Sequence, residues 1–162
     1  MIRPATPADF NAVGRVTVEA YRADGQLADE ADGYGEVLAD VAGRAAEGEV
    51  LVAVDASGTV VGAVTFTLPG TPYAQLAGPG EAEFRMLAVD PARQGNGVGE
   101  LLVRACVERA GQTGASAVII CTRDFALAAQ RLYARLGFVR VPERDWSPMP
   151  GVNLLGLRLA LQ

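Results

Sequence analysis

The residues best suited to chemistry are three glycines on alternate positions, Gly95, Gly97 and Gly99, in the stretch QGNGVG (94–99). This stretch lies between a run typical of a strand and a run typical of a helix. Such a turn presents unpaired backbone N–H groups at the positive end of a helix dipole, and glycine allows close approach because it has no Cβ. The pattern predicts an anion site, most often one for phosphate, although a purely structural tight turn has the same composition.

Two familiar phosphate-binding motifs do not fit this turn. The dinucleotide fingerprint Gly-x-Gly-x-x-Gly, started at Gly95, requires glycine at position 100, which is Glu100. The P-loop requires Gly-Lys followed by Ser or Thr, and the chain has no lysine. The identity of the anion must therefore come from other parts of the sequence.

The chain lacks two residue types that carry much of enzyme chemistry. It contains no histidine, and all 14 of its basic residues are arginine. A Ser-His-Asp triad, a zinc site with histidine ligands and a lysine Schiff base are therefore excluded within this chain. Cys106 and Cys121 are too few for a disulfide framework or a four-cysteine metal site, and each lies in an apolar run typical of a buried free thiol. We expect no metal.

The elements on either side must position the glycine turn. Residues 82–90 predict a strand before it, and residues 98–114 predict an amphipathic helix after it. The other predicted elements are a strand at 1–6, a helix from Pro7 to Ala23, a loop at 24–32, a helical stretch at 34–48, a hairpin at 49–68, a Pro/Gly-rich connection at 67–81, a strand at 115–122, a helix at 125–137, and strands at 138–142 and near 153–161. This order predicts an α+β fold, a mixed sheet with helices on its faces, in one domain spanning 1–162.

Composition narrows the class of partner. A formal charge of −5 at pH 7 and a pI near 4.7 argue against nucleic acid, which normally requires a basic face. The longest apolar runs are the length of strands, and the start MIRPATPADF has no signal-peptide core. We expect no membrane attachment and a cytoplasmic location.

The segment MLAVDPARQGNGVGELL (86–102) resembles the acetyl-CoA-binding motif of the GNAT superfamily of N-acyltransferases. That motif has a Leu-x-Val strand end, a proline and Gln/Arg-x-x-Gly-x-Gly/Ala, matched here by Leu87, Val89, Pro91, Gln94, Gly97 and Gly99. A second family segment is matched by Ala129, Leu132, Tyr133, Leu136, Gly137 and Phe138. The opening IRPATPADF is also similar to the family's first strand and helix, so the resemblance covers nearly the whole chain.

The resemblance implies a splayed mixed sheet flanked by helices and acetyl-CoA as co-substrate. The turn's amides would hold the pyrophosphate of coenzyme A, and the strand before the turn would bind the pantetheine arm as an added strand. The implied cofactor-binding residues are Leu87, Ala88, Val89, Gln94, Gly95, Asn96, Gly97, Val98 and Gly99. Ala126 stands where many relatives carry an asparagine, so one side-chain contact to pantetheine is lost or replaced.

Acyl transfer to an amine requires removal of an amine proton, a partner for the oxyanion and a proton for the departing thiolate. The resemblance implies that Tyr133 protonates the sulfur and that Glu83 is the base. Glu81 and an ordered water remain alternatives for the base, and a backbone N–H near Leu87 would meet the oxyanion. The structural alternatives are, at Glu83, an ordinary carboxylate that is exposed or paired with an arginine such as Arg85 and, at Tyr133, an aromatic packed on the sheet.

The family architecture implies that the acceptor enters from the side opposite the cofactor. The residues expected along that approach are Tyr21, Asp24, Asp29, Glu30, Asp32, Tyr34 and Glu36 on one side and Arg144, Asp145 and Trp146 on the other. Residues 24–40 contain six carboxylates, the last at Asp40, and no arginine. This charge predicts a cationic primary amine, on a small molecule or a peptide, as acceptor.

Two function classes remain open. The first is an N-acetyltransferase that works by direct attack of the amine. The second is a non-catalytic acyl-CoA-binding module that senses the cofactor. The sequence leaves open the acyl chain preference and the oligomeric state, a homodimer included.

Overall fold

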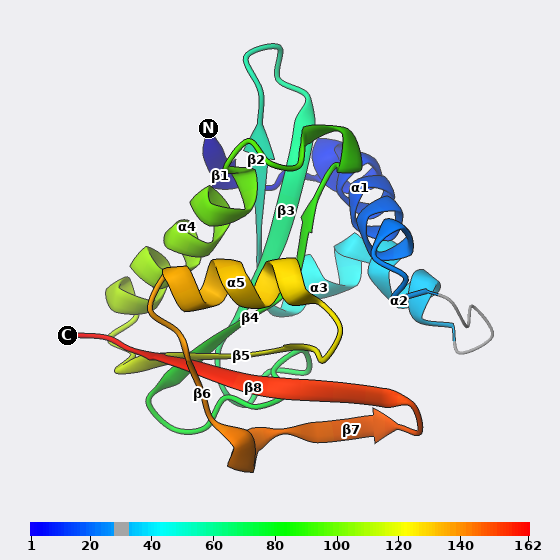
Figure 1. The fold of residues 1–162 in the computed structure, drawn as a ribbon. Helices are drawn as coiled ribbons and strands as arrows, with labels where there is room; N and C mark the ends of the chain where they lie inside the picture. The colour runs from blue at the N-terminus through cyan, green and yellow to red at the C-terminus, as the bar shows by residue number, and fades with distance from the viewer. Residues whose placement is uncertain (28–32) are drawn as a thin grey trace.

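The structure, a computed structural model, describes residues 1–27 and 33–162. Its strands form one 8-stranded mixed sheet in the order β1-β2-β3-β4-β5-β8-β6, with β7 also paired to β8 (Figure 1). The strands are β1 (Ile2–Pro4), β2 (Glu49–Val54), β3 (Val60–Thr67), β4 (Glu81–Val89), β5 (Ala117–Arg123), β6 (Val139–Arg140), β7 (Trp146–Met149) and β8 (Val152–Ala160). The helices are α1 (Phe10–Ala23), α2 (Tyr34–Ala39), α3 (Val41–Glu47), α4 (Val98–Gln112) and α5 (Leu127–Arg135), and short 3-10 turns lie at Pro7–Asp9, Pro91–Arg93 and Pro142–Arg144.

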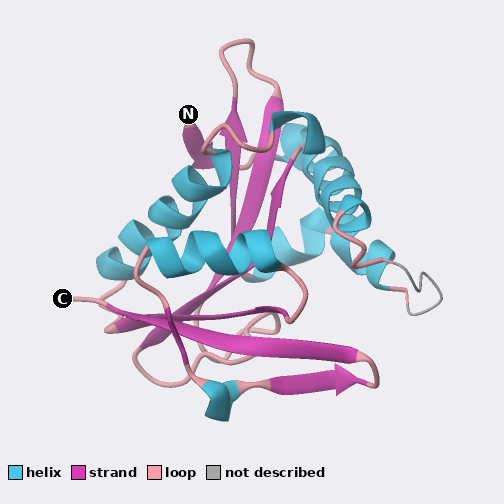
Figure 2. Ribbon diagram, in the orientation of Figure 1, coloured by secondary structure: helices cyan, strands magenta, loops and turns pink. Residues whose placement is uncertain are grey.

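Helices cover both faces of the sheet (Figure 2). In β2, Val50 and Val52 pack in the core cluster that contains residues of α1 and α3, whereas Leu51 and Ala53 pack in the cluster that contains residues of α4. A strand buried on both faces is apolar at successive positions, which accounts for the run VLVAV. The predicted fold class, a mixed sheet with helices on its faces, is confirmed.

The predicted start of the first helix is confirmed by its cap. The Asp9 carboxylate accepts a hydrogen bond from the Thr6 backbone N–H at 2.8 Å, and Pro7 occupies the first position of the turn that leads into α1. Arg3 of β1 also pairs with Asp9, at 2.7 Å. The first strand and the first helix are thereby joined.

The second helical stretch, predicted to be continuous over 34–48, is two helices separated at Asp40. The Asp40 side chain caps α3 by accepting from the Gly43 N–H at 3.0 Å. The buried Arg44 guanidinium donates to the carbonyls of Val37, Leu38 and Asp40, at 3.2, 2.8 and 3.2 Å. The Val37 carbonyl also accepts from the Asp40 N–H at 3.2 Å. Arg44 thus adds donors at the end of α2, where the helical pattern of hydrogen bonds ends.

The end of the chain also differs from prediction. The strand predicted at 138–142 is reduced to the two residues of β6, and β7 was not predicted at all. β7 contains Pro148, which argues against a strand in a sequence but is tolerated at the edge of a sheet. Among the described residues, no helix is long and apolar enough to cross a membrane.

The feature that positions the site is the short pairing of β4 with β5. The two strands run parallel for three pairs only, from Glu81 with Ala117 to Glu83 with Ile119. Beyond Glu83, β4 continues along β3 and β5 continues along β8. The sheet therefore splays, and α5 lies across the place where the strands separate (Figure 1).

Glu81 anchors the closed end of this splay. Its carboxylate accepts from Arg144 at 2.9 Å, from Arg158 at 3.0 Å and from the Gly78 N–H at 2.9 Å. Burial by itself would raise the pKa of Glu81, but these three donors outweigh it and bring the pKa to about 2. Glu81 is thus a structural anion and a poor base.

This pairing predicts a pH-dependent contribution to stability. Because the pKa of Glu81 is lower in the folded chain than its ordinary value of 4.5, the contribution is complete above about pH 4.5 and is lost as the pH falls toward 2. The free energy of unfolding at pH 7 should be lower in the Glu81→Gln variant than in wild type by on the order of 3 kcal/mol. The difference from wild type should close between about pH 4.5 and 2, measured by denaturant unfolding at each pH. A difference that is constant over this range would contradict the role given to the Glu81 charge.

Candidate functional site

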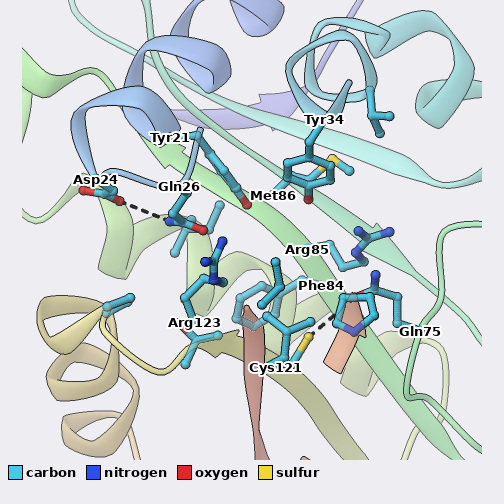
Figure 3. A pocket seen from close by; sticks show the side chains of 18 of the residues that line it. Tyr21, Asp24, Gln26, Tyr34, Gln75, Phe84, Arg85, Met86, Cys121 and Arg123 are labelled. Carbon is cyan, nitrogen blue, oxygen red and sulfur yellow. Dashed lines mark hydrogen bonds between the residues drawn. The ribbon is translucent and has the colours of Figure 1, made fainter. Parts of the chain in front are cut away.

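A cavity of about 300 Å³ opens where β4 and β5 separate (Figure 3). It is lined by residues of β4, β5, α5, the first two helices and the β7–β8 hairpin: Tyr21, Asp24, Gln26, Tyr34, Val37, Gln75, Phe84, Arg85, Met86, Leu87, Cys121, Thr122, Arg123, Ala126, Ala129, Tyr133, Pro148, Met149, Val152 and Leu154. This volume is at the small end of the range for ligand sites.

A β-bulge in β4 faces this cavity. Ala63 pairs with Ala88 and Thr65 pairs with Arg85, so Val64 alone faces both Met86 and Leu87. Met86 has a φ of 57°, which makes it the only residue other than glycine with a positive φ among those that the structure describes. The bulge disrupts the ladder with β3 at a point where pairing with β5 has already ended. Backbone polar groups are thus available to a ligand near Leu87, where the oxyanion partner was predicted.

Tyr133, on α5, also lines the cavity. Its ring packs against Phe84 of β4 and against Phe138, with centroids 6.0 and 5.7 Å apart, and the residue is 6% exposed. Its hydroxyl makes no hydrogen bond to any of the described residues. Burial raises the pKa of this hydroxyl, so it stays protonated at neutral pH. The ring is held by packing while the hydroxyl remains a free proton donor.

Glu83 is fully buried and lies behind the cavity wall rather than in it. Its Oε1 accepts from the N–H groups of Gln75, Leu76 and Ala77 at 3.0, 2.9 and 2.9 Å, and Oε2 receives only a second contact from Gln75 at 3.2 Å. Burial raises the pKa of Glu83, and the three amides oppose that rise without cancelling it. Glu83 is thus not an exposed carboxylate, and Arg85, the suggested partner, donates instead to the Tyr73 carbonyl at 3.0 Å.

The glycine turn lies at the far end of β4 and outside the cavity. Gly95 and Gly97 have φ values of 84° and 82°, and a Cβ added at either would meet no atom within 4 Å. Gly97 is the N-cap of α4, so the first amides of that helix are exposed beside open space. An added Cβ on Gly99 would lie 3.5 Å from Leu132, which places the start of α4 against α5. The turn therefore adjoins the helix that carries Tyr133.

The charged groups of the cavity differ from those expected at an acidic entrance. Arg85 and Arg123 line it, and Asp24 is the one carboxylate among the described lining residues. Asp29, Glu30 and Asp32 lie outside the described residues, and Glu36 and Asp40 do not line the cavity. On the other predicted side, Arg144 pairs with Glu81, and Asp145 pairs with Arg140 at 2.7 Å. Trp146 does not line the cavity either.

The two cysteines have different surroundings. Cys106 is buried, as predicted, whereas Cys121 is only partly buried and lines the cavity. Burial, with a smaller effect of the Glu83 charge, raises the pKa of the Cys121 thiol to about 11. A thiol with this pKa is almost entirely protonated at neutral pH and is a weak nucleophile.

The structure brings some of the predicted site residues together. Leu87 and Tyr133 line one cavity, together with Ala126 at the start of α5. Ala88 is buried beside the bulge, and Val89 leads toward the turn at Gln94–Gly99. Sequence reasoning did not assign Arg85 and Arg123 to the site. Their only signal was a charged residue in or at the end of an otherwise apolar strand.

The family is decided by a comparison with known proteins. A model described as "Acetyltransferase (GNAT) family" matches residues 15–138. The chain belongs to this family. The family, the fold and the enzyme class predicted from the sequence are confirmed: the chain is an acetyltransferase of the GNAT family.

Relatives of this GNAT chain are found among curated proteins and solved structures. An N-acetyltransferase of Schizosaccharomyces pombe is 33% identical over 113 residues, and the N-acetylaspartate synthetase of Danio rerio is 37% identical over 71. These matches cover 70% and 44% of this chain but only 65% and 25% of the relatives' own lengths.

The solved structures are similar over nearly the whole chain. A GNAT-family acetyltransferase of Staphylococcus aureus has a TM-score of 0.75 at 13% identity and covers 100% of this chain and 99% of its own. One from Kribbella flavida has a TM-score of 0.69 at 27% identity and covers 99% and 97%. One from Brucella melitensis, in complex with acetyl-CoA, has a TM-score of 0.65 at 26% identity and covers 100% and 88%.

The environment of Cys121 predicts its reactivity. Because its pKa is about 11 instead of 9.0, the thiolate fraction at pH 7 is about 100-fold smaller than that of a free cysteine. Alkylation by iodoacetamide, followed by peptide mass spectrometry, should be correspondingly slow at pH 7 and rise about tenfold per pH unit up to pH 10. Cys106 should stay unmodified throughout, and Cys121→Ser should remove the signal. Fast labelling of Cys121 at pH 7 would show that its thiol is activated.

Proposed function

We propose that the protein transfers the acetyl group of acetyl-CoA to a primary amine of a small molecule or peptide. One observation carries the proposal: the bulge at Met86 and Leu87 and the side chain of Tyr133 line the same cavity between splayed strands. A polar backbone and a neutral proton donor are the two groups that thioester aminolysis requires.

The residues fit coenzyme A. The amides at the start of α4, beside Gly95 and Gly97, form a site for the pyrophosphate, because those glycines leave open space. The β4 edge at Leu87, Ala88 and Val89 has no β5 partner and accepts the pantetheine arm as an added strand. Ala126 and Ala129 keep the neighbouring cavity wall small.

A substitution in the turn tests this site. Gly97→Ala should weaken binding of coenzyme A at least tenfold, measured by calorimetry, because a Cβ enters the space from which the amides reach the phosphates. The positive φ also strains the fold by about 1–2 kcal/mol. Gly114→Ala is the matched control, since Gly114 at the other end of α4 has a φ of 80° and equally open surroundings. Equal weakening in both variants would assign the effect to strain.

Bound acetyl-CoA supplies an activated thioester, and the chain's residues handle the charges and protons. In the transfer a C–N bond forms, the C–S bond breaks, and the amine loses one proton while the thiolate gains one. A backbone N–H at the bulge stabilises negative charge on the acyl oxygen. Tyr133 donates the proton to the sulfur. Cys121 takes no covalent part because its thiol stays protonated, which favours direct attack by the amine.

Removal of the amine proton is assigned to Glu83 acting through an ordered water. Three amides occupy Oε1 of Glu83, whereas Oε2 keeps capacity for a further bond. Direct contact with the amine is not expected, because Glu83 does not line the cavity. Glu81, the other carboxylate on this strand, is held by two arginines and is excluded by its low pKa.

Removal of the Tyr133 hydroxyl should slow turnover and leave the fold intact. Tyr133→Phe keeps the packing against Phe84 and Phe138 and deletes a group with no hydrogen-bond partner among the described residues. We expect kcat to fall about 100-fold, while the Kd for acetyl-CoA and the Tm change little. Steady-state kinetics and thermal unfolding measure these quantities. Unchanged kcat would show that the hydroxyl has no part in the reaction.

The activity itself is tested by release of free thiol from acetyl-CoA in the presence of a panel of amines. The panel should include polyamines, peptide N-termini, lysine peptides and free amino acids. Thiol release that depends on an amine, with the N-acetyl product found by mass spectrometry, supports the proposal. Tight binding of acetyl-CoA without thiol release from any amine would instead indicate the sensing module.

A further inference from the structure

The acceptor end of the cavity contains two arginines that have no carboxylate partner. Arg85 comes from β4 and Arg123 from the end of β5, and Figure 3 shows both in the pocket together with Tyr21 and Tyr34. Neither arginine forms a salt bridge within the described chain. Most arginines of the turn and of the closed end of the splay are paired, for example Arg93 with Asp55 and Arg158 with Glu81. The two cavity arginines differ from these in having no carboxylate partner within the described chain.

Arg123 has no hydrogen-bond acceptor among the described residues. Its Nε is buried and has no hydrogen-bond partner. A buried donor without a partner destabilises the fold unless a ligand accepts its hydrogen bond. Its guanidinium carbon lies 4.7 Å from the centre of the Phe125 ring. Stacking of this kind occupies the face of the group and leaves its N–H edges available for the two oxygens of a carboxylate.

Arg85 supports the same ligand. One of its nitrogens donates to the Tyr73 carbonyl at 3.0 Å, which fixes the side chain and leaves other donors free. Nearby, the buried Arg44 adds a third positive charge, and its hydrogen bonds go to backbone carbonyls alone. Among the described residues that line the cavity, two arginines therefore stand against one carboxylate, Asp24.

The negative groups nearby do not neutralise this charge. Asp24 is exposed, and its carboxylate accepts from the Gln26 amide at 3.5 Å rather than from Arg85 or Arg123. Glu83 carries a charge near Arg85, but its oxygens are directed to the amides of residues 75–77. An anion brought by a ligand is thus the missing partner of the two cavity arginines.

We propose that the acceptor is an amine that also carries a carboxylate, a free amino acid, and that Arg123 and Arg85 bind this carboxylate. The inference rests on the proposed function, since it names the substrate of the same site. It replaces attraction of a plain cationic amine, expected from the acidic residues at 24–40, with recognition of a zwitterion. In a free amino acid the amine and the carboxylate are attached to the same carbon, so both groups can lie in one cavity.

The test measures binding and turnover separately. The twenty common amino acids are titrated calorimetrically into the protein with coenzyme A present, a combination that cannot turn over. For each amino acid that binds, the derivative amidated at every carboxyl group is the matched probe, because it keeps the amine and loses the negative charge. We expect at least one amino acid to bind, and its amide to bind at least tenfold more weakly.

Variants assign the effect to the cavity arginines. Arg123→Gln should weaken binding of the amino acid at least tenfold and that of the amide less than twofold, and Arg85→Gln should act in the same direction. Arg15→Gln is the matched control, since it removes the same charge from the exposed face of α1. Thermal unfolding should show that all three variants are folded, because Arg123 forms no hydrogen bond to the described residues and Arg85 forms one.

The outcomes separate the two proposals. Binding that depends on the carboxylate and on Arg123, without thiol release from acetyl-CoA, supports the inference and contradicts the proposed function. Thiol release with carboxylate-free amines alone supports the proposed function and overturns the inference. Equal affinity for amino acid and amide, equal weakening of both by Arg123→Gln, or no binding of any amino acid would also overturn it.

Discussion

The site depends on one constraint, which is that β4 and β5 remain paired for only three residues. Beyond these residues each strand pairs only with its other neighbour, β4 with β3 and β5 with β8. At the last of the β4–β5 pairs, the Glu83 carboxylate binds the amides of residues 75–77 and so fixes that loop to β4. Without the splay, the Met86 bulge would face another strand and Tyr133 would pack on a closed sheet. The end of the β4–β5 pairing therefore accounts for the exposed backbone at the bulge, for the cavity and for the position of Tyr133 beside it.

The two most deeply buried charges of the described chain are stabilised by backbone groups. Arg44 is 1% exposed and Glu83 is 0% exposed, yet neither forms an ion pair within the described chain. Arg44 instead satisfies the carbonyl end of α2, and Glu83 satisfies amides of a loop that has few other partners. A charge that binds backbone dipoles in this way recovers part of its lost solvation and orders an irregular segment. Arg123 has no such partners, which distinguishes it from these structural charges.

A feature of the fold or site could be predicted from the sequence when the residues that cause it are close together in the chain. The glycine turn was predictable because the positive φ at Gly95 and Gly97 is a local demand of the chain. The family resemblance supplied Tyr133 and Leu87. The break at Asp40 had a local signal, an Asp three residues before Gly43, which the apolar periodicity concealed. The burial of Glu83 had no local signal, because its hydrogen-bond partners belong to an irregular loop. Arg123 enters the site only because β5 diverges from β4. The division of the chain into one domain and the roles of individual site residues stay predictions.

The ends of the sheet have a consequence for how copies of the molecule associate. One edge is β1, with three residues, and the other is made of β6 and β7, with two and four residues and Pro148 among them. Edges this short offer few unpaired amides and carbonyls to the strand of another molecule. A continuous intermolecular sheet is thus disfavoured, and the apolar strands of the interior are protected from templating aggregation. Self-association through helices, loops or side chains on the faces would leave the cavity's strands free for ligands.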